Sequence, residues 1–249
     1  MLKFFGSIRY NLIETEKTSK YLKYGVGEII LVVIGILIAL QINNWNENRK
    51  NKHQEKEFLI ALKETLNRDL DRNLESQNIN QKALHSMRVI EKHMAQDLPY
   101  HDSLKHHFGG ATNFQFWDLS ESVFKSLEAT GLDLISNDDL RDSLALAYGN
   151  HNKFINFAGF RYHDYMDHAI LNIFNKHFDM AWGNPKLPPF KTVMIPLDYE
   201  SLKSDKEFKY FLKTLPNLHY YKLIWPLEST EQLLKRLLFL IDKELEKFN

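Results

Sequence analysis

Residues 25–42, GVGEIILVVIGILIALQI, decide the architecture of this chain. The stretch contains one charged residue, Glu28, near its beginning. A helix of this length extends over roughly 27 Å, because each residue adds about 1.5 Å, and this approaches the thickness of a bilayer's hydrocarbon core. Tyr24 and Trp45 flank the stretch, and both residue types favour the membrane–water interface. The sequence therefore predicts one membrane-spanning helix.

Two other interpretations of this stretch are disfavoured. A buried core helix would need a large domain around it, and the charged residues 46–57 that follow give no sign of one. A cleaved signal peptide would need a shorter leading region and a small-residue cleavage site, whereas the chain continues as IALQINNW. An uncleaved signal anchor fits the pattern better.

Gly35 and Ala39 lie four residues apart within the apolar stretch. Small residues at this spacing let two membrane helices approach closely, although small residues are also frequent in membrane helices generally. The pair is therefore a candidate contact for a homodimer.

The orientation of the helix depends on the basic residues around it. Residues 1–24 form a basic tail in which Leu2, Phe5, Ile8 and Leu12 recur at helical spacing. Four Lys or Arg residues lie within about 20 residues on each side of the apolar stretch, so the positive-inside rule does not decide. A basic amphipathic tail favours the anionic cytoplasmic leaflet. The predicted location is a bacterial inner membrane, with the N-terminal tail cytoplasmic and the C-terminal domain periplasmic.

The composition excludes several classes of protein. Lys and Arg total 32 and so do Asp and Glu, which argues against a general nucleic-acid binder. The chain contains no cysteine, so disulfides, thiolate metal sites and cysteine catalysis are excluded. A hydrophobic fraction of 44% with 17 Phe residues is enough for a core outside the membrane.

The remaining pattern predicts an all-α protein. The domain after the membrane helix, residues 43–249, divides into a helical stalk (46–98) and a soluble helical bundle (99–249). Leucines at 59, 62, 66, 70 and 74 predict the apolar face of the stalk, which is interrupted near residues 77–80 and then resumes. Bundle helices are expected at 120–130, 138–148, 152–182, 204–215 and 229–248, the fourth ending before Pro216. A short edge strand is conceivable at 192–195.

Two stretches resemble a known family. GEIILVVIGILIALQINNWNENRK (27–50) and FKSLEATGLDLISNDDLRDSL (124–144) resemble the family catalogued as domain of unknown function 6090, found mainly in Bacteroidota. The opening MLKFFGSIRYNLI is also similar to that family. The resemblance implies a single-pass membrane protein. It implies no activity and no catalytic or binding residues.

The densest cluster of ionisable residues is His163, Asp164, Asp167 and His168. Histidine and carboxylate side chains one turn apart can share in binding a metal. Because a helix turns about 100° per residue, His163 and Asp167 share one face whereas Asp164 and His168 lie on another. The four side chains therefore cannot converge on one ion, and two local acid–imidazole pairs are the alternative. His163 and Asp167 remain the metal candidates, and no bound metal or cofactor is expected.

Other motifs give weaker evidence for a functional site. His101, His106 and His107 with Asp102 could bind a transition metal or could be exposed polar residues. The glycine pair at 109–110 lacks the following Lys-Ser or Lys-Thr of a phosphate loop, and no serine-hydrolase or zincin motif is present. An aromatic stripe could stack a ligand, but such stripes more often pack in a core. Its members are Phe154, Phe157, Phe160, Tyr162 and Tyr165.

The sequence thus favours a membrane-anchored, extracytoplasmic interaction or sensing module that is not an enzyme and has an unknown protein partner. A membrane-tethered metal-dependent hydrolase that uses the region 163–168 is one alternative. A structural subunit of an envelope complex is another.

Overall fold

The computed structural model describes residues 18–179 and 193–248, and every regular element among them is a helix. The predicted all-α fold is confirmed. The one β-type pairing among these residues is an isolated bridge between Phe178 and Pro196, so the described part of the suggested strand at 192–195 is not a strand. The first 17 residues of the predicted tail lie outside the described ranges.

The chain divides into two compact units, Met1–Gln54 and Glu55–Asn249, and the boundary lies within helix α2 (Thr18–Ala95). In the first unit, α2 carries the apolar stretch, and none of its most apolar 18-residue window is buried. Among the described residues, α2 is the one helix long and apolar enough to cross a membrane.

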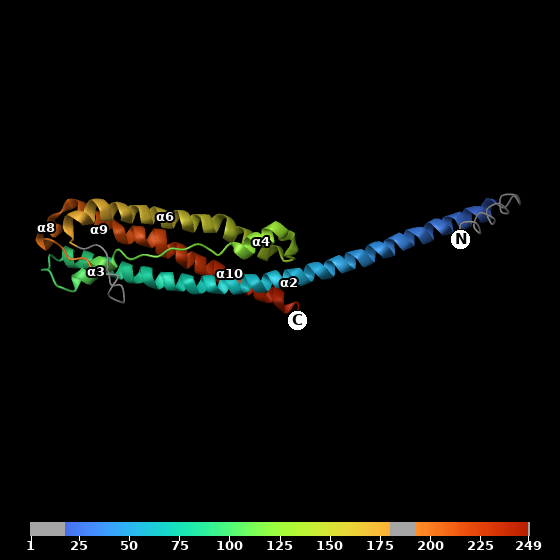
Figure 1. Cartoon of the computed structure of the whole chain (residues 1–249), viewed down its shortest axis with the longest axis horizontal. Coiled ribbons are helices and arrows are strands. Elements are labelled where there is room, and N and C mark those ends of the chain that lie inside the picture. The colour runs from blue at the N-terminus through green and yellow to red at the C-terminus, as the bar shows by residue number, and fades with distance from the viewer. Residues whose placement is uncertain (1–17, 180–192, 249) are drawn as a thin grey trace. The chain divides into compact units, whose positions relative to one another are not determined.

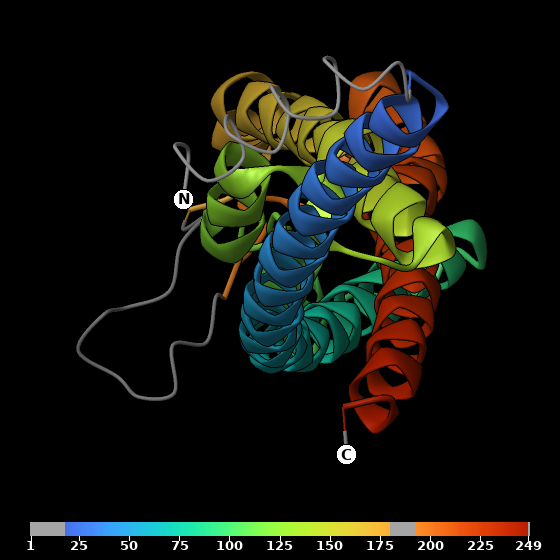
Figure 2. The same ribbon diagram turned by 90° about the vertical axis from the view of Figure 1, so that its right-hand side faces the viewer.

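The second unit contains three long helical rods. The first is α2 from Glu55 onward. The second joins α5 (Asp138–Leu146), the π-helical segment η2 (Ala147–His151), α6 (Asn152–Ala169), the π segment η3 (Ile170–Phe174) and α7 (Asn175–His177). The third joins α9 (Lys206–His219), the π segment η4 (Tyr220–Ile224) and α10 (Trp225–Glu246). The rods lie side by side in this unit (Figures 1 and 2).

Short elements connect the rods. They are α3 (Leu104–Gly110), α4 (Ser122–Thr130), the 3₁₀ turn η1 (Leu132–Leu134) and α8 (Tyr199–Ser204). Asn137 caps α5 by accepting a hydrogen bond from the Leu140 N–H. The third rod continues through Pro216, so the expected end at residue 215 is wrong. Buried residues on both sides of the proline, such as Leu215 and Leu223, supply packing that outweighs its lost hydrogen bond.

One seam of α2 packs against the other two rods. Its buried positions alternate in steps of four and three, as in a heptad repeat. They are Glu55, Leu59, Leu62, Leu66, Asp69, Asn73, Ser76, Asn80, Ala83, Met87 and Ile90. Residues 55–90 therefore belong to the core of the second unit and pack with helices that lie between residues 99 and 249.

The middle of this seam is polar. It separates an apolar core around Leu59, Leu62 and Leu66 from another around Met87 and Ile90. Four fully buried residues of α2 form this polar layer: Asp69, Asn73, Ser76 and Asn80. The sequence analysis expected Leu70 and Leu74 on the buried face, but Leu70 is only partly buried and Leu74 is exposed. At this level α2 contacts its neighbours through the polar side chains of Asp69 and Asn73 instead.

The polar layer binds the backbone of an extended segment, residues 113–121, which has no regular structure. Asn80 Nδ2 donates to the Gln115 carbonyl at 2.7 Å, and Asn80 Oδ1 accepts from the Gln115 N–H at 3.3 Å. The Asp69 carboxylate accepts from the N–H and hydroxyl of Ser120 at 2.9 and 2.7 Å. The Asn152 side chain accepts from the Leu119 N–H at 2.9 Å. Side chains thus satisfy backbone groups that a strand would pair with a sheet.

At the level of the polar layer, hydrogen bonds of His219 connect the three rods. Its Nε2 lies 2.9 Å from the Asn80 carbonyl, which can only accept, so Nε2 carries the proton. Nδ1 consequently accepts from the Tyr162 hydroxyl at 2.8 Å. Burial lowers the pKa of His219 to about 4, and the hydrogen bond to the Asn80 carbonyl opposes this only in part.

Gly159 is where α6 meets the extended segment. A Cβ at this position would overlap Cδ2 and Cγ of the Phe116 ring. The close approach of Phe116 to α6 therefore requires glycine.

We predict that Gly159→Ala destabilises the protein although alanine favours helices by up to about 1 kcal/mol. Displacing Phe116 costs roughly 1–3 kcal/mol, as is usual for overpacking. The matched control is Gly149→Ala, because outside its own helix backbone no atom of the described residues lies within 4 Å of a Cβ there. Urea unfolding of the full chain in detergent measures both, and equal stability of the two variants would contradict the prediction.

We predict that His219 makes stability depend on pH. The unfolded histidine binds a proton near pH 6.5 but the folded one only near pH 4, so its contribution is complete above about 6.5 and is lost as the pH falls toward 4. The slope reaches about 1.4 kcal/mol per pH unit, and the loss totals roughly 3 kcal/mol. His219→Gln keeps a donor and an acceptor but does not titrate, so its unfolding free energy falls less over this range.

Urea unfolding at pH 7.5, 6, 5 and 4.5 compares wild type with His219→Gln. The difference between the two is informative because buried carboxylates add the same pH dependence to both. Gly149→Ala, which changes no titratable group, is the control and keeps the wild-type slope. Parallel losses in wild type and His219→Gln would show that His219 is not the source.

Candidate functional site

The metal candidates His163 and Asp167 form a local pair on the surface of α6. His163 Nδ1 lies 3.2 Å from Asp167 Oδ2, and the two side chains are 49% and 55% exposed. The His163 ring also meets the edge of Phe114 at a centroid distance of 5.9 Å. This is one of the two acid–imidazole pairs that the sequence offered as the alternative to a metal site.

Asp164 and His168 do not join this pair. Asn172 Nδ2 donates to His168 Nδ1 at 3.1 Å, one turn along the same rod. Asp164 instead lines a surface hollow described below. Within residues 18–179 and 193–248, no three His, Asp or Glu side chains lie close enough together to hold a metal ion.

The histidines near residue 101 are also dispersed. His101 Nδ1 lies 2.8 Å from the Ser103 hydroxyl, whereas His107 Nδ1 lies 3.4 Å from the Ser86 hydroxyl. The His107 ring faces His85 at a centroid distance of 6.1 Å, a neighbour on α2 that sequence spacing could not reveal. Burial, followed by the charges of His85 and His106, lowers the pKa of His107.

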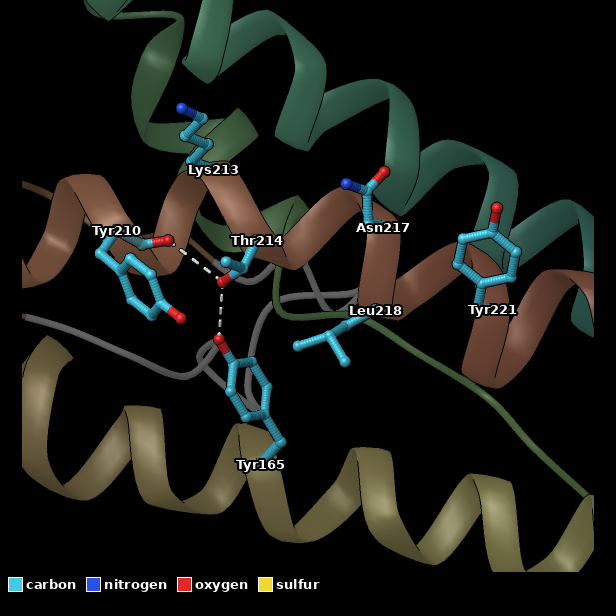
Figure 3. A pocket seen from close by; sticks show the side chains of 7 residues that line it. All are labelled: Tyr165, Tyr210, Lys213, Thr214, Asn217, Leu218 and Tyr221. Carbon is cyan, nitrogen blue, oxygen red and sulfur yellow. Dashed lines mark hydrogen bonds between the residues drawn. The ribbon is translucent and has the colours of Figure 1, made fainter.

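A hollow of about 640 Å³ lies between α6 and the α9–η4 rod (Figure 3). The two helices run antiparallel here, because Tyr165 pairs with Thr214 and Tyr162 pairs with His219. Its lining residues from the third rod recur every three or four positions, as one helical stripe. The lining consists of Tyr165, Tyr210, Lys213, Thr214, Asn217, Leu218 and Tyr221.

A hydroxyl pair joins the two walls of this hollow. The Thr214 hydroxyl donates to a backbone carbonyl one turn earlier, so its oxygen accepts from the Tyr165 hydroxyl at 3.1 Å (Figure 3). The Tyr165 oxygen keeps lone pairs free to accept from a ligand. Burial raises the pKa of Tyr165, which therefore stays protonated at neutral pH. Tyr210 and Tyr221 are 73% and 63% exposed.

A second hollow of about 320 Å³ adjoins the first, and the two share Tyr165 and Leu218. It adds two basic residues, Arg161 and Lys222, and the carboxylate of Asp164. We name the two hollows together the tyrosine groove. Its charged side chains are three cations, including Lys213, and one anion.

Exposed aromatic rings continue beyond one end of the groove. Phe154 of α6 meets Trp225 at the start of α10, edge to face at a centroid distance of 5.9 Å. Phe157 and Phe160 are exposed on the same helix. The aromatic stripe of the sequence is therefore divided: Tyr162 is a core residue, whereas the three phenylalanines face outward.

The sequence analysis named Tyr162 and Tyr165 of the α6 wall, but as part of an aromatic stripe that more often packs in a core, and it missed the opposite wall. The helical spacing of Tyr210, Thr214, Asn217 and Tyr221 was a usable signal. It was hidden because Pro216 suggested that the helix ended in the middle of the stripe.

Comparison with known proteins identifies a family. The model of the family of unknown function DUF6090 matches residues 28–164, more than half of the chain. The matched range contains most of the apolar stretch, the polar layer of α2 and α6 as far as Asp164. Searches among curated proteins and among solved structures found no match. The resemblance noted in the sequence is confirmed, and the chain belongs to the family of unknown function DUF6090.

Proposed function

We propose that this chain is a single-pass membrane protein whose helical second unit binds a partner, as an interaction or sensing module without catalytic activity. The observation that carries the anchoring is the exposed apolar surface of α2. From Ile29 to Leu40 every aliphatic side chain except those of the small residues is about half exposed or more. A contiguous apolar surface of this kind is unfavourable in water and favourable in a bilayer.

The proposed arrangement places residues 25–42 in a bacterial inner membrane. The basic tail lies on the cytoplasmic side, because it is attracted to anionic lipids, and the second unit lies in the periplasm. Two copies pair through Gly35 and Ala39, and no described atom lies within 4 Å of a Cβ built on Gly35. The tyrosine groove supports the binding role, since pockets lined by aromatic rings and a few polar groups are typical ligand sites.

We predict that the wild-type chain stays in the membrane pellet after alkaline carbonate extraction. Ile34→Lys with Leu37→Lys places two charges near the middle of the stretch, each costing about 2.5–3.5 kcal/mol on insertion scales, so the variant is released. The control is Ile60→Lys with Leu74→Lys, at exposed apolar residues of the same helix outside the stretch. Release of the wild type, or retention of both variants, would contradict anchoring by residues 25–42.

Orientation is tested by fusing alkaline phosphatase after Asn249, with a fluorescent protein that matures only in the cytoplasm as the counter-reporter. Phosphatase activity is expected. Fluorescence without phosphatase activity would place the second unit in the cytoplasm and overturn the proposed orientation.

A further inference from the structure

We propose that the tyrosine groove and the aromatic residues next to it bind an acidic peptide segment of a partner protein. Apolar side chains of the peptide pack on the exposed rings, and its carboxylates pair with Arg161, Lys213 and Lys222. This inference rests on the proposed function, because it names the chemistry of the partner that the second unit would bind.

The shape of the surface fits a chain better than a compact ligand. Along the third rod, the groove lining runs from Tyr210 to Lys222, which is roughly 18 Å at 1.5 Å per residue, and Trp225 follows it. Along α6, the lining runs from Arg161 to Tyr165, and the exposed rings of Phe157 and Phe154 continue in the direction of Trp225. Figure 3 shows the side chains that line the larger hollow, which come from α6 and from the third rod between Tyr210 and Tyr221. Peptide segments commonly dock along grooves between helices.

The rings supply binding surface at low entropic cost. Tyrosine and tryptophan have few rotatable bonds and carry much of the energy of protein interfaces. The third rod carries Tyr210, Tyr221 and Trp225, and α6 carries Phe154 and Phe157. The side chains of all five residues have large exposed fractions. A run of exposed rings of this size on one face marks an interaction surface.

The charges of the groove determine the sign of the charge that a partner would carry. Arg161, Lys213 and Lys222 form no ion pair with any described residue, so their charges are available to a ligand. Asp164 is the one carboxylate that lines the groove within the described ranges. A ligand with negative charge is therefore complementary. A second copy of this groove would bring like charges together, so self-association through this face is disfavoured.

The test is peptide display on the full chain in detergent micelles. A random library of twelve-residue peptides on phage is the probe, and empty micelles are the subtraction control. The selected peptides are expected to share an excess of Asp and Glu over Lys and Arg together with apolar residues. One selected peptide, labelled with fluorescein, then gives dissociation constants by fluorescence polarisation, and its binding weakens as salt is raised.

Variants locate the binding. Lys213→Glu with Lys222→Glu is expected to weaken it at least about tenfold, and Tyr221→Ala by about tenfold. The matched control is Lys82→Glu with Arg236→Glu, exposed cations outside the groove, and its affinity stays within about twofold of wild type. All substituted residues have exposed or partly exposed side chains, and circular dichroism melting curves confirm that each variant is folded.

Failure to select peptides, selection of peptides without acidic excess, or equal binding by wild type and groove variants would each overturn the proposal. These outcomes are separate from those of the membrane experiments. Carbonate extraction and the reporter fusions report anchoring and orientation, whereas the binding assay reports the groove in a solubilised chain.

Discussion

The second unit depends on hydrogen bonds from buried side chains of α2 to the backbone of a segment without regular structure. Residues 113–121 cross the bundle in an extended form, and their N–H and C=O groups would be costly to bury without hydrogen bonds. Asn80 and Asp69 supply those bonds at Gln115 and Ser120. Two heptads before Asp69, the carboxylate of Glu55 binds the N–H and hydroxyl of Ser136 at 2.7 and 2.8 Å in the same manner. Asp69 and Glu55, both on the seam of α2, thus bind Ser120, which precedes α4, and Ser136, which precedes the cap of α5.

A polar layer inside a bundle lowers stability relative to an apolar one, but it specifies how the helices align. Asp69, Asn73, Ser76 and Asn80 occupy seam positions where leucine would be more stabilising. Leucines at these positions would pack equally well in several alignments of α2 with its neighbours, whereas the polar side chains form their hydrogen bonds in only one alignment. The amide nitrogen of Asn73 and the hydroxyl of Ser76 have no partner among the described residues, so part of the cost remains. We interpret the layer as the feature that fixes the register between α2, the extended segment and His219.

This alignment also forms the proposed binding surface. Tyr162 and His219 connect α6 to the third rod and reach α2 through Asn80, and Tyr162 also lines the smaller hollow of the tyrosine groove. The groove walls are therefore held by a buried network, while the rings and cations on the rim remain exposed. A rigid floor with an adaptable rim suits the binding of a peptide, because little order has to be imposed on the protein. The π-helical turn η4 lies in this wall, and such turns often occur where a helix departs from regular packing for function.

The sequence by itself determined the all-α class, the apolar helix at residues 25–42 and the family, because these depend on local periodicity, on the length of an apolar run and on short motifs. It also offered the pair of His163 with Asp167, which is a contact within about one turn of helix. Only the tertiary structure decided that α2 continues into the core, that the third rod passes through Pro216 and that Tyr165 faces Thr214. These features depend on contacts between residues far apart in the chain. Leu70 and Leu74 misled the periodic analysis because the buried seam positions beside them are the polar Asp69 and Asn73, and the partner of Asp69, Ser120, is distant in the chain.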